Sequence, residues 1–137
     1  MPDKKEANPP GRWDRFLRLL RSRRFRVADR SMDPTLVPGD CLYVDRGAFR
    51  AHPPARGDLV VSRDPALPAR HLVKRVAFVS GEPAPPGSPT VPAGSVYLLG
   101  DNPPMSRDSR QFGPVPTRFL VGRVYRCYNP PERRRDL

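Results

Sequence analysis

Proline most restricts what this chain can fold into, because it occupies 20 of the 137 positions, against an average usage of about 5%. Proline fixes its own φ angle and lacks an N–H, so it interrupts both helices and the interiors of sheets. The pattern therefore favours short strands joined by turns over long helices. A chain of this length is sufficient for one domain with a single hydrophobic core.

Short apolar segments that alternate with turn sequences predict a mainly β domain over residues 25–130. The turn sequences are residues 38–40 (PGD), 56–58 (RGD) and 85–87 (PPG), which are typical of chain reversals. Residues 80–94 contain five prolines and predict an irregular surface loop between two strands. The expected strands are Phe25–Val27, Cys41–Asp45, Asp58–Arg63, His71–Val79, Ser95–Leu99 and Phe119–Tyr128.

Outside this domain we expect a basic N-terminal arm, residues 1–24, and a charged, frayed tail, residues 131–137. Residues 1–11 are polar and are expected to be disordered. Within residues 12–24, an i, i+3, i+4, i+7 apolar stripe predicts a short amphipathic helix. Two interpretations of this helix stay open: it packs on the domain, or it lies on an anionic membrane surface. The stripe consists of Trp13, Phe16, Leu17 and Leu20.

The net charge of +11 is concentrated near the N-terminus, where residues 1–30 carry ten Lys and Arg against four Asp and Glu. Such a cluster suits an anionic membrane, nucleic acid or plain solvation. No stretch of about 18 apolar residues predicts a transmembrane helix, and residues 16–20 are too short and charged for a secretory signal. Cys41 and Cys127 are expected as small buried hydrophobes, without a disulfide framework or a metal site.

One basic residue lies in an apolar setting. In the predicted strand of residues 71–79, alternation places Leu72, Lys74, Val76 and Phe78 on one face. A lysine on an apolar face either extends its amine to water or holds it out of water. Desolvation lowers the pKa of lysine, and a neutral amine can act as a general base. Lys74 is therefore a candidate base.

Two further segments supply candidate partners for that base. Ser31 precedes Asp33-Pro34, and the proline keeps Asp33 out of the helical region, so the serine lies at a rigid entry to a turn. Residues 100–116 form a polar segment in which Asp108 and Arg110 could pair. This segment also supplies the hydroxyls of Ser106 and Ser109. The alternative interpretation of residues 100–116 is a surface loop with local hydrogen bonds.

Three of these segments resemble the conserved boxes of the type I signal peptidases. Residues 31–36 (SMDPTL) followed by 38–40 (PGD) resemble the nucleophile box. Residues 74–76 (KRV) are similar to the general-base box. Residues 100–102 (GDN), 106, 108–110 (DSR) and 112–116 (FGPVP) are similar to the last box. The three boxes occur in the family's order and together cover most of residues 27–125.

The resemblance implies a Ser–Lys dyad on the β-rich fold shared with LexA-type self-cleaving repressors. Ser31 Oγ is expected to attack the scissile carbonyl, while neutral Lys74 takes its proton and returns it to the leaving amine. By the same resemblance Ser106 orients the lysine. The residues implied to support the site structurally are Asn102, Asp108 and Arg110.

The chain departs from the family at Asp29, two positions before Ser31, where a serine or glycine is usual. An ionised carboxylate cannot donate a hydrogen bond to an oxyanion and repels developing negative charge. The Ser31 N–H remains as one donor, and the second is open. Residues 77–82 (AFVSGE) also depart from the family pattern. The large second domain of some members has no room, and the family's N-terminal membrane anchor is not expected.

The predicted function is a serine endopeptidase that cleaves leader or signal peptides from precursor proteins, without a metal or organic cofactor. Met32 is expected to line a shallow substrate pocket, and an extended substrate would add as a strand beside residues 71–79. One alternative is a dedicated maturation peptidase for nickel-type superoxide dismutase. Membrane association follows from the resemblance, although a cytoplasmic or peripheral location stays open.

Three other interpretations are disfavoured. His71 as the base is disfavoured because it lies three residues from Lys74, on the opposite face of a strand. A LexA-like regulator is disfavoured because residues 1–25 are too short for a helix-turn-helix domain. A non-catalytic, basic nucleic-acid-binding module is supported by the net charge of +11, but all three boxes retain the dyad residues.

Overall fold

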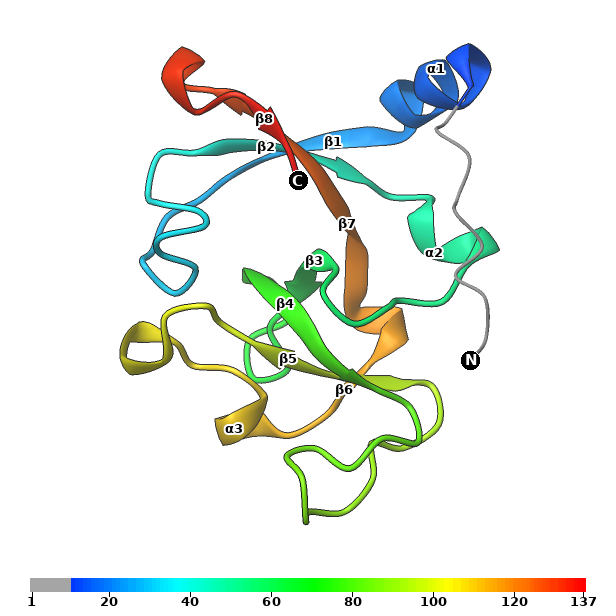
Figure 1. Cartoon of the computed structure of the whole chain (residues 1–137), viewed down its shortest axis with the longest axis vertical. Helices are drawn as coiled ribbons and strands as arrows, with labels where there is room; N and C mark the ends of the chain where they lie inside the picture. The colour runs from blue at the N-terminus through cyan, green and yellow to red at the C-terminus, as the bar shows by residue number, and fades with distance from the viewer. Residues whose placement is uncertain (1–10) are drawn as a thin grey trace.

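The computed structural model describes residues 11–137. Its centre is one eight-stranded antiparallel sheet with the order β1-β2-β7-β3-β4-β5-β6, and β8 pairs with β7 (Figure 1). The strands are β1 Ser22–Arg26, β2 Cys41–Asp45, β3 Leu59–Arg63, β4 His71–Val79, β5 Ser95–Leu99, β6 Val115–Pro116, β7 Leu120–Asn129 and β8 Arg135–Asp136. Short helices connect them: α1 Arg12–Arg21, α2 Ala48–Ala51, η1 Pro103–Met105, α3 Ser109–Phe112, η2 Thr117–Phe119 and η3 Pro131–Arg133.

The long strand β7 joins the two halves of the sheet. It pairs with β2 on one side and with β3 on the other, and register shifts interrupt both pairings. Such irregularities bend strands and increase their twist. In Figure 1 β1, β2 and β8 lie at one end of β7, and β3 to β6 lie toward the other end. The sheet therefore curls, and its two faces enclose separate apolar clusters.

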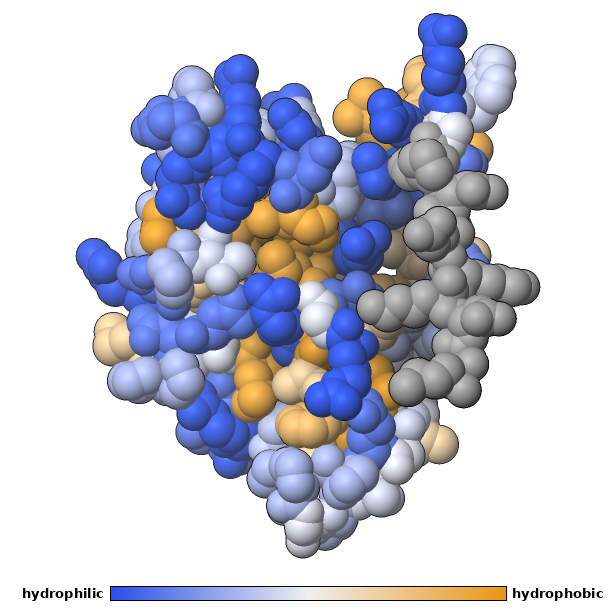
Figure 2. Space-filling view, viewed as in Figure 1, coloured by the Kyte–Doolittle hydropathy of each residue, from blue (hydrophilic) through white to orange (hydrophobic). Residues whose placement is uncertain are grey.

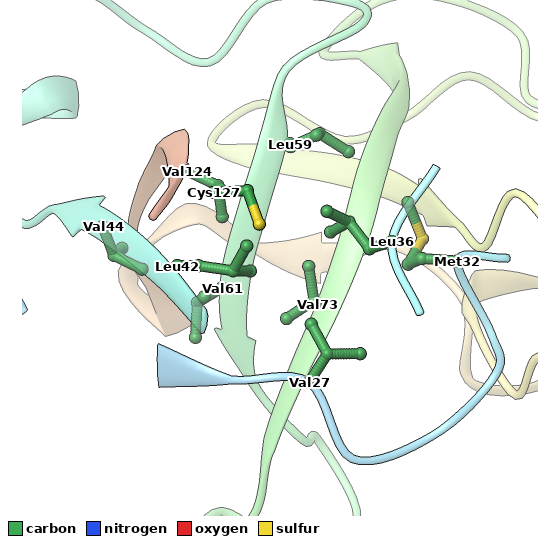
Figure 3. Close-up of a cluster of buried hydrophobic side chains, with 10 residues drawn as sticks. All are labelled: Val27, Met32, Leu36, Leu42, Val44, Leu59, Val61, Val73, Val124 and Cys127. Carbon is green, nitrogen blue, oxygen red and sulfur yellow. The ribbon is translucent and has the colours of Figure 1, made fainter. Parts of the chain in front are cut away.

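Consecutive residues of β3 point into these two clusters, as expected for a strand buried on both faces. Leu59 and Val61 belong to the larger cluster, which also receives Met32 and Leu36 from the turn after β1 (Figure 3). Val60 belongs to the second cluster. The remaining members of the larger cluster are Val27, Leu42, Val44, Val73, Val124 and Cys127.

The strand predictions are confirmed with small changes at the boundaries. Residues 41–45, 71–79 and 95–99 are strands as expected, while the predicted 58–63 begins one residue later and 119–128 is displaced by one. The predicted strand 25–27 is found as Ser22–Arg26, which begins three residues earlier and ends one residue earlier. The short strands β6 and β8 were not predicted, because two residues show no periodicity. The loop of residues 80–94 is less irregular than expected. It contains a bridge between Pro83 and Thr90, and it buries Ala84 and Val91 against Tyr97.

The predicted N-terminal helix is present but ends earlier than residue 24. Helix α1 stops at Arg21, and residues 22–24 already belong to β1, whose pairing with β2 overrides the helical pattern. The apolar stripe of α1 does not pack on the domain: Trp13 is 79% exposed and Leu20 is 65% exposed. The prediction for residues 1–10 lies outside the described residues.

The C-terminal tail is ordered, so the prediction that it frays is wrong. Strand β8 pairs with β7, and the N–H of Leu137 donates to the carbonyl of Tyr125 over 3.0 Å. The guanidinium of Arg133 contacts the buried carboxylate of Asp40 at 2.7 Å. This ion pair was not foreseen, because it joins residues 93 positions apart.

Over residues 11–137, none of the helices has both the length and the apolar character needed to cross a bilayer. Figure 2 shows apolar side chains next to strongly hydrophilic ones on the projecting helix α1.

Candidate active site

Lys74 lies in the middle of β4 and is the largest of the fully buried side chains, with 2% of its surface exposed. Its register partner on β3 is Val60, and Leu72 and Val76 are buried on either side of it along β4. Burial lowers the pKa of Lys74, although the carboxylates of Asp29 and Asp108 act in the opposite direction. The structure therefore places an amine with a lowered pKa in an apolar wall.

A chain of hydrogen bonds leads from this amine to a fixed carboxylate. Lys74 Nζ donates to Ser106 Oγ over 3.2 Å, and Ser106 Oγ donates to Asp108 Oδ2 over 2.7 Å. Asp108 also accepts from Arg110 Nε over 2.9 Å and from the Gly100 N–H over 2.9 Å. These contacts bring Lys74 to Ser106 and pair Asp108 with Arg110.

Asp108 is fully buried, yet it stays ionised in the folded chain. Burial raises its pKa, but hydrogen bonds from Arg110, the Gly100 N–H and Ser106 outweigh burial and lower the pKa to about 2. Its second carboxylate oxygen accepts from the Arg110 N–H and so caps helix α3. Asp108 thus fixes both the Ser106 hydroxyl and the start of α3.

Gly100 marks the place where the segment of Ser106 meets the segment of Ser31. A Cβ atom built on Gly100 would overlap the side chain of Ser106 and lie 2.6 Å from the carbonyl oxygen of Ser31. Only a residue without a side chain permits this approach. The turn that carries Ser31 and the loop that carries Ser106, the hydrogen-bond partner of Lys74, therefore meet at Gly100.

Ser31 is 3% exposed and is held by backbone contacts from the same loop. The N–H of Asn102 donates to the Ser31 carbonyl over 2.9 Å, and Asn102 Nδ2 donates to the Arg30 carbonyl over 2.9 Å. Asn102 therefore braces the turn that carries Ser31. The Ser31 N–H donates to Asp29 Oδ1 over 3.0 Å. This last contact occupies the backbone donor that the sequence offers to an oxyanion.

A second brace was not predicted from the sequence. Arg75 donates two hydrogen bonds, of 2.9 and 2.8 Å, to the carboxylate of Asp101, which also accepts from Thr35 Oγ1 over 2.6 Å. Strand β4 is thereby tied to the turn that follows Ser31. Arg75 and Asp101 lie in two of the segments that resemble the signal peptidase boxes, but their spacing in the sequence does not show that their side chains meet.

A groove runs past Ser31 between the turn after β1 and the start of β4. It encloses about 190 Å³ and is lined by Phe25, Val27, Ala28, Asp29, Ser31, Met32, Arg70, His71, Leu72 and Val73. Met32 forms part of this lining but is otherwise buried in the larger cluster. The His71 ring lies against Phe25, with ring centroids 6.2 Å apart. The structure records no hydrogen bond from the imidazole of His71 to Ser31.

The structure thus combines a curled β sheet with a buried lysine and a serine on a nearby turn. These features are those of a β-rich peptidase fold that can carry a Ser–Lys dyad. The family model described as "Signal peptidase, peptidase S26" matches residues 15–85 and 82–128. The chain therefore belongs to the S26 signal peptidase family.

Curated relatives agree with this family. The chain is 42% identical over 105 residues to the mitochondrial ATP-independent inner membrane protease subunit 1b of Arabidopsis thaliana, a match covering 69% of this chain and 62% of that protein. It is 33% identical to the mitochondrial inner membrane protease subunit 1 of Mus musculus, with the same coverage. Signal peptidase I of Leptolyngbya laminosa is 30% identical over 81% of this chain and 70% of that protein. The match thus spans less than two thirds of the first two relatives.

Proposed function

We propose that this chain is a serine endopeptidase that removes leader or signal peptides from precursor proteins by means of a Ser31–Lys74 dyad. Membership of the S26 family and the names of the relatives, inner membrane protease subunit and signal peptidase I, support the reaction class. The observation that carries the proposal is the buried amine of Lys74, hydrogen-bonded to Ser106 beside the turn of Ser31.

The apolar wall around Lys74 suits a general base. Since burial lowers its pKa, the amine is neutral at lower pH than an exposed lysine and can accept the Ser31 hydroxyl proton. The resulting alkoxide attacks the scissile carbonyl and forms an acyl-enzyme as the C–N bond breaks, and the ammonium of Lys74 protonates the leaving amine. Water then hydrolyses the ester, with Lys74 again removing a proton. Ser106 positions the amine for both transfers.

The groove beside Ser31 suits an extended peptide. The start of β4 forms part of its lining, and its small volume of about 190 Å³ favours small side chains next to the scissile bond. A peptide that adds along β4 gains backbone hydrogen bonds irrespective of its sequence. The general processing of leaders is therefore preferred to a single dedicated substrate, although maturation of nickel-type superoxide dismutase remains the alternative substrate.

The dyad is tested by comparing cleavage of a leader-bearing precursor by the wild-type chain and by S31A and K74M. Both variants are expected to lose at least about a thousandfold in kcat/KM. K74M keeps the length of the side chain and removes a costly buried amine, so its Tm should equal or exceed that of the wild type. Ser80→Ala, at an exposed serine, is the matched control. Unchanged cleavage by either dyad variant overturns the assignment.

We also propose that α1 attaches the chain to an anionic membrane surface. The helix presents Trp13, Phe16 and Leu20 to solvent, and arginines alternate with them along the segment. This combination is typical of helices that lie in the lipid headgroup region. The same arginines could contact nucleic acid, but exposed apolar side chains add nothing to phosphate binding. The membrane interpretation is therefore preferred.

A further inference from the structure

Asp29 stands at the point where the proposed reaction develops negative charge. In acyl transfer the backbone N–H of the nucleophilic serine is a common donor to the oxyanion. In this chain that N–H already donates to Asp29 Oδ1 over 3.0 Å. A carboxylate oxygen bound to the donor competes with a substrate carbonyl for the same position. The resting site therefore holds a negative charge where the intermediate must place its own.

We propose that Asp29 is an autoinhibitory latch that closes the oxyanion position until a substrate displaces its carboxylate. The inference rests on the proposed peptidase function and adds a regulatory element to the same site. On this proposal Asp29, which cannot donate a hydrogen bond to an oxyanion, does not prevent catalysis by Ser31 and Lys74, because it moves away when the substrate binds. Rotation of the Asp29 side chain away from Ser31 frees the N–H without moving the backbone of the turn.

The charges around the site support a second effect of the latch. Lys74 faces the carboxylates of Asp29 and Asp108 and the guanidinium groups of Arg107 and Arg70. The charge of Asp108 is paired with Arg110 through a bidentate contact. Asp29 is held by the Ser31 N–H and is influenced by the charges of Lys74 and Arg70. Its negative charge stabilises the ammonium form of Lys74 and so opposes the neutral form that the base requires.

The groove beside Ser31 can accommodate the displaced carboxylate of Asp29. Arg70 is exposed and lines the same groove as Asp29, so a carboxylate that turns away from Ser31 stays near a cationic group that already acts on it. A peptide lying along β4 and entering between Asp29 and Ser31 would drive this exchange. Opening of the latch is then coupled to substrate binding, and an empty site remains unreactive.

Substitution of Asp29 tests the latch. D29S and D29G both free the Ser31 N–H, and D29S adds a hydroxyl that can donate. Both are expected to raise kcat/KM at least about tenfold, since one oxyanion donor is worth 10²–10³ in kcat. They should also bind a peptide aldehyde, which forms a hemiacetal with the serine, correspondingly more tightly. If D29G lowers the Tm, D29S carries the comparison.

The pH profile separates the two effects of Asp29. D29N removes the charge but keeps an oxygen that can accept from the Ser31 N–H. We expect D29N to move the acid limb of kcat/KM to lower pH, because the pKa of Lys74 falls when a nearby negative charge is lost. Its gain in rate should be smaller than that of D29S. Glu132→Gln, which removes one exposed negative charge in η3, should change neither quantity.

The outcomes distinguish the latch from the peptidase itself. If the wild type cleaves, S31A does not, and D29S and D29G show no gain in kcat/KM or aldehyde affinity, the latch is overturned and the peptidase stands. A loss of activity in both variants would make Asp29 a residue required for turnover, which also overturns the latch. If wild type, D29S, D29G and S31A are all equally inactive, the proposed function fails and the latch fails with it.

Discussion

At the scale of the residue, the site depends on the different surroundings of two buried ionisable side chains next to Ser106, Lys74 and Asp108. Lys74 is buried among valines and leucines, and the one side-chain hydrogen bond of its amine within the described residues is to Ser106. Asp108 is equally buried but accepts hydrogen bonds from Arg110, Gly100 and Ser106. Burial therefore moves the lysine toward its neutral form, while hydrogen bonding keeps the carboxylate charged.

The pKa of Asp108 predicts a specific loss of stability in acid. Its pKa is about 2 in the folded chain, against about 3.9 for an unfolded aspartate. A lowered folded pKa gives stability that is present above the unfolded value and is lost as the pH falls from about 4 toward 2. This lowering of the pKa corresponds to roughly 2–3 kcal/mol of stability at neutral pH. Urea unfolding between pH 7 and pH 2 measures this loss.

Asp108→Asn is the variant that tests the acid effect. It should lower the free energy of unfolding at pH 7 by about 2 kcal/mol or more, because Arg110 and Gly100 lose a charged acceptor. The same variant should show a flatter dependence of stability on pH between 4 and 2. Asp136→Asn, at an ion pair whose carboxylate is 84% exposed, should leave that dependence unchanged. A wild-type slope in Asp108→Asn would contradict the assignment.

Residue-scale predictions from the sequence succeeded where a residue's type constrained its partners. Period-two alternation marked Lys74 as a charge on an apolar face, and the burial agrees. The role of Asp29 could only be stated as a missing donor. That its carboxylate turns back onto the Ser31 N–H depends on a local side-chain rotation, which periodicity does not encode.

At the scale of the element, α1 carries an apolar stripe that does not pack against the rest of the described chain. Its stripe left two interpretations open, packing on the domain or lying on a membrane surface, and no residue of α1 is buried. Contacts at its C-terminal end fix the helix nonetheless. Arg21 donates to Asp45 over 3.2 Å, and the Arg18 guanidinium lies 4.0 Å from the centre of the Tyr125 ring. The helix is therefore held with its apolar side chains outward.

This orientation predicts binding to anionic vesicles. The double variant W13A/L20A should weaken binding at least tenfold, because burying each side chain in the headgroup region is worth roughly 1.5–3 kcal/mol. Leu67→Ala is the matched control, since Leu67 is a similarly exposed apolar residue outside α1. Co-sedimentation with vesicles that contain anionic phospholipid measures the affinity. Equal binding by W13A/L20A and Leu67→Ala would exclude α1 as the attachment site.

Elements long enough to show a hydrophobic periodicity in the sequence were predictable, and those that form only by pairing with a distant segment were not. Strand β4 has nine residues and was placed without error. Strand β8 has two residues and exists only because it pairs with β7. The end of α1 was misplaced for a related reason: residues 22–24 continue the basic, helix-compatible composition, but pairing with β2 determines their conformation.

At the scale of the whole molecule, the C-terminal tail contacts the turn that follows Ser31. Arg133 reaches back to Asp40, in the turn that follows Ser31, and its second amino group donates to the Thr35 carbonyl over 3.4 Å. Arg135 also donates to the Thr35 carbonyl. The sequence suggested a frayed tail because it is charged, but Arg133 instead pairs with the buried carboxylate of Asp40. The tail is therefore part of the support for the Ser31 turn.

The tail therefore predicts a large stability effect at a position far from the site in sequence. Arg133→Ala leaves the fully buried carboxylate of Asp40 without its counter-charge, and losing hydrogen bonds to a charged group costs about 1.5–3 kcal/mol. We expect this loss in urea unfolding, together with a fall in cleavage as the Ser31 turn loosens. The double variant D40N/R133A should recover part of the stability, because it removes the unpaired charge. Asp136→Asn breaks only an exposed pair and should cost no more than about 1 kcal/mol. If Arg133→Ala were as mild as Asp136→Asn, the tail would be a surface appendage and the Ser31 turn would have to be held by Asn102 and Asp101 alone.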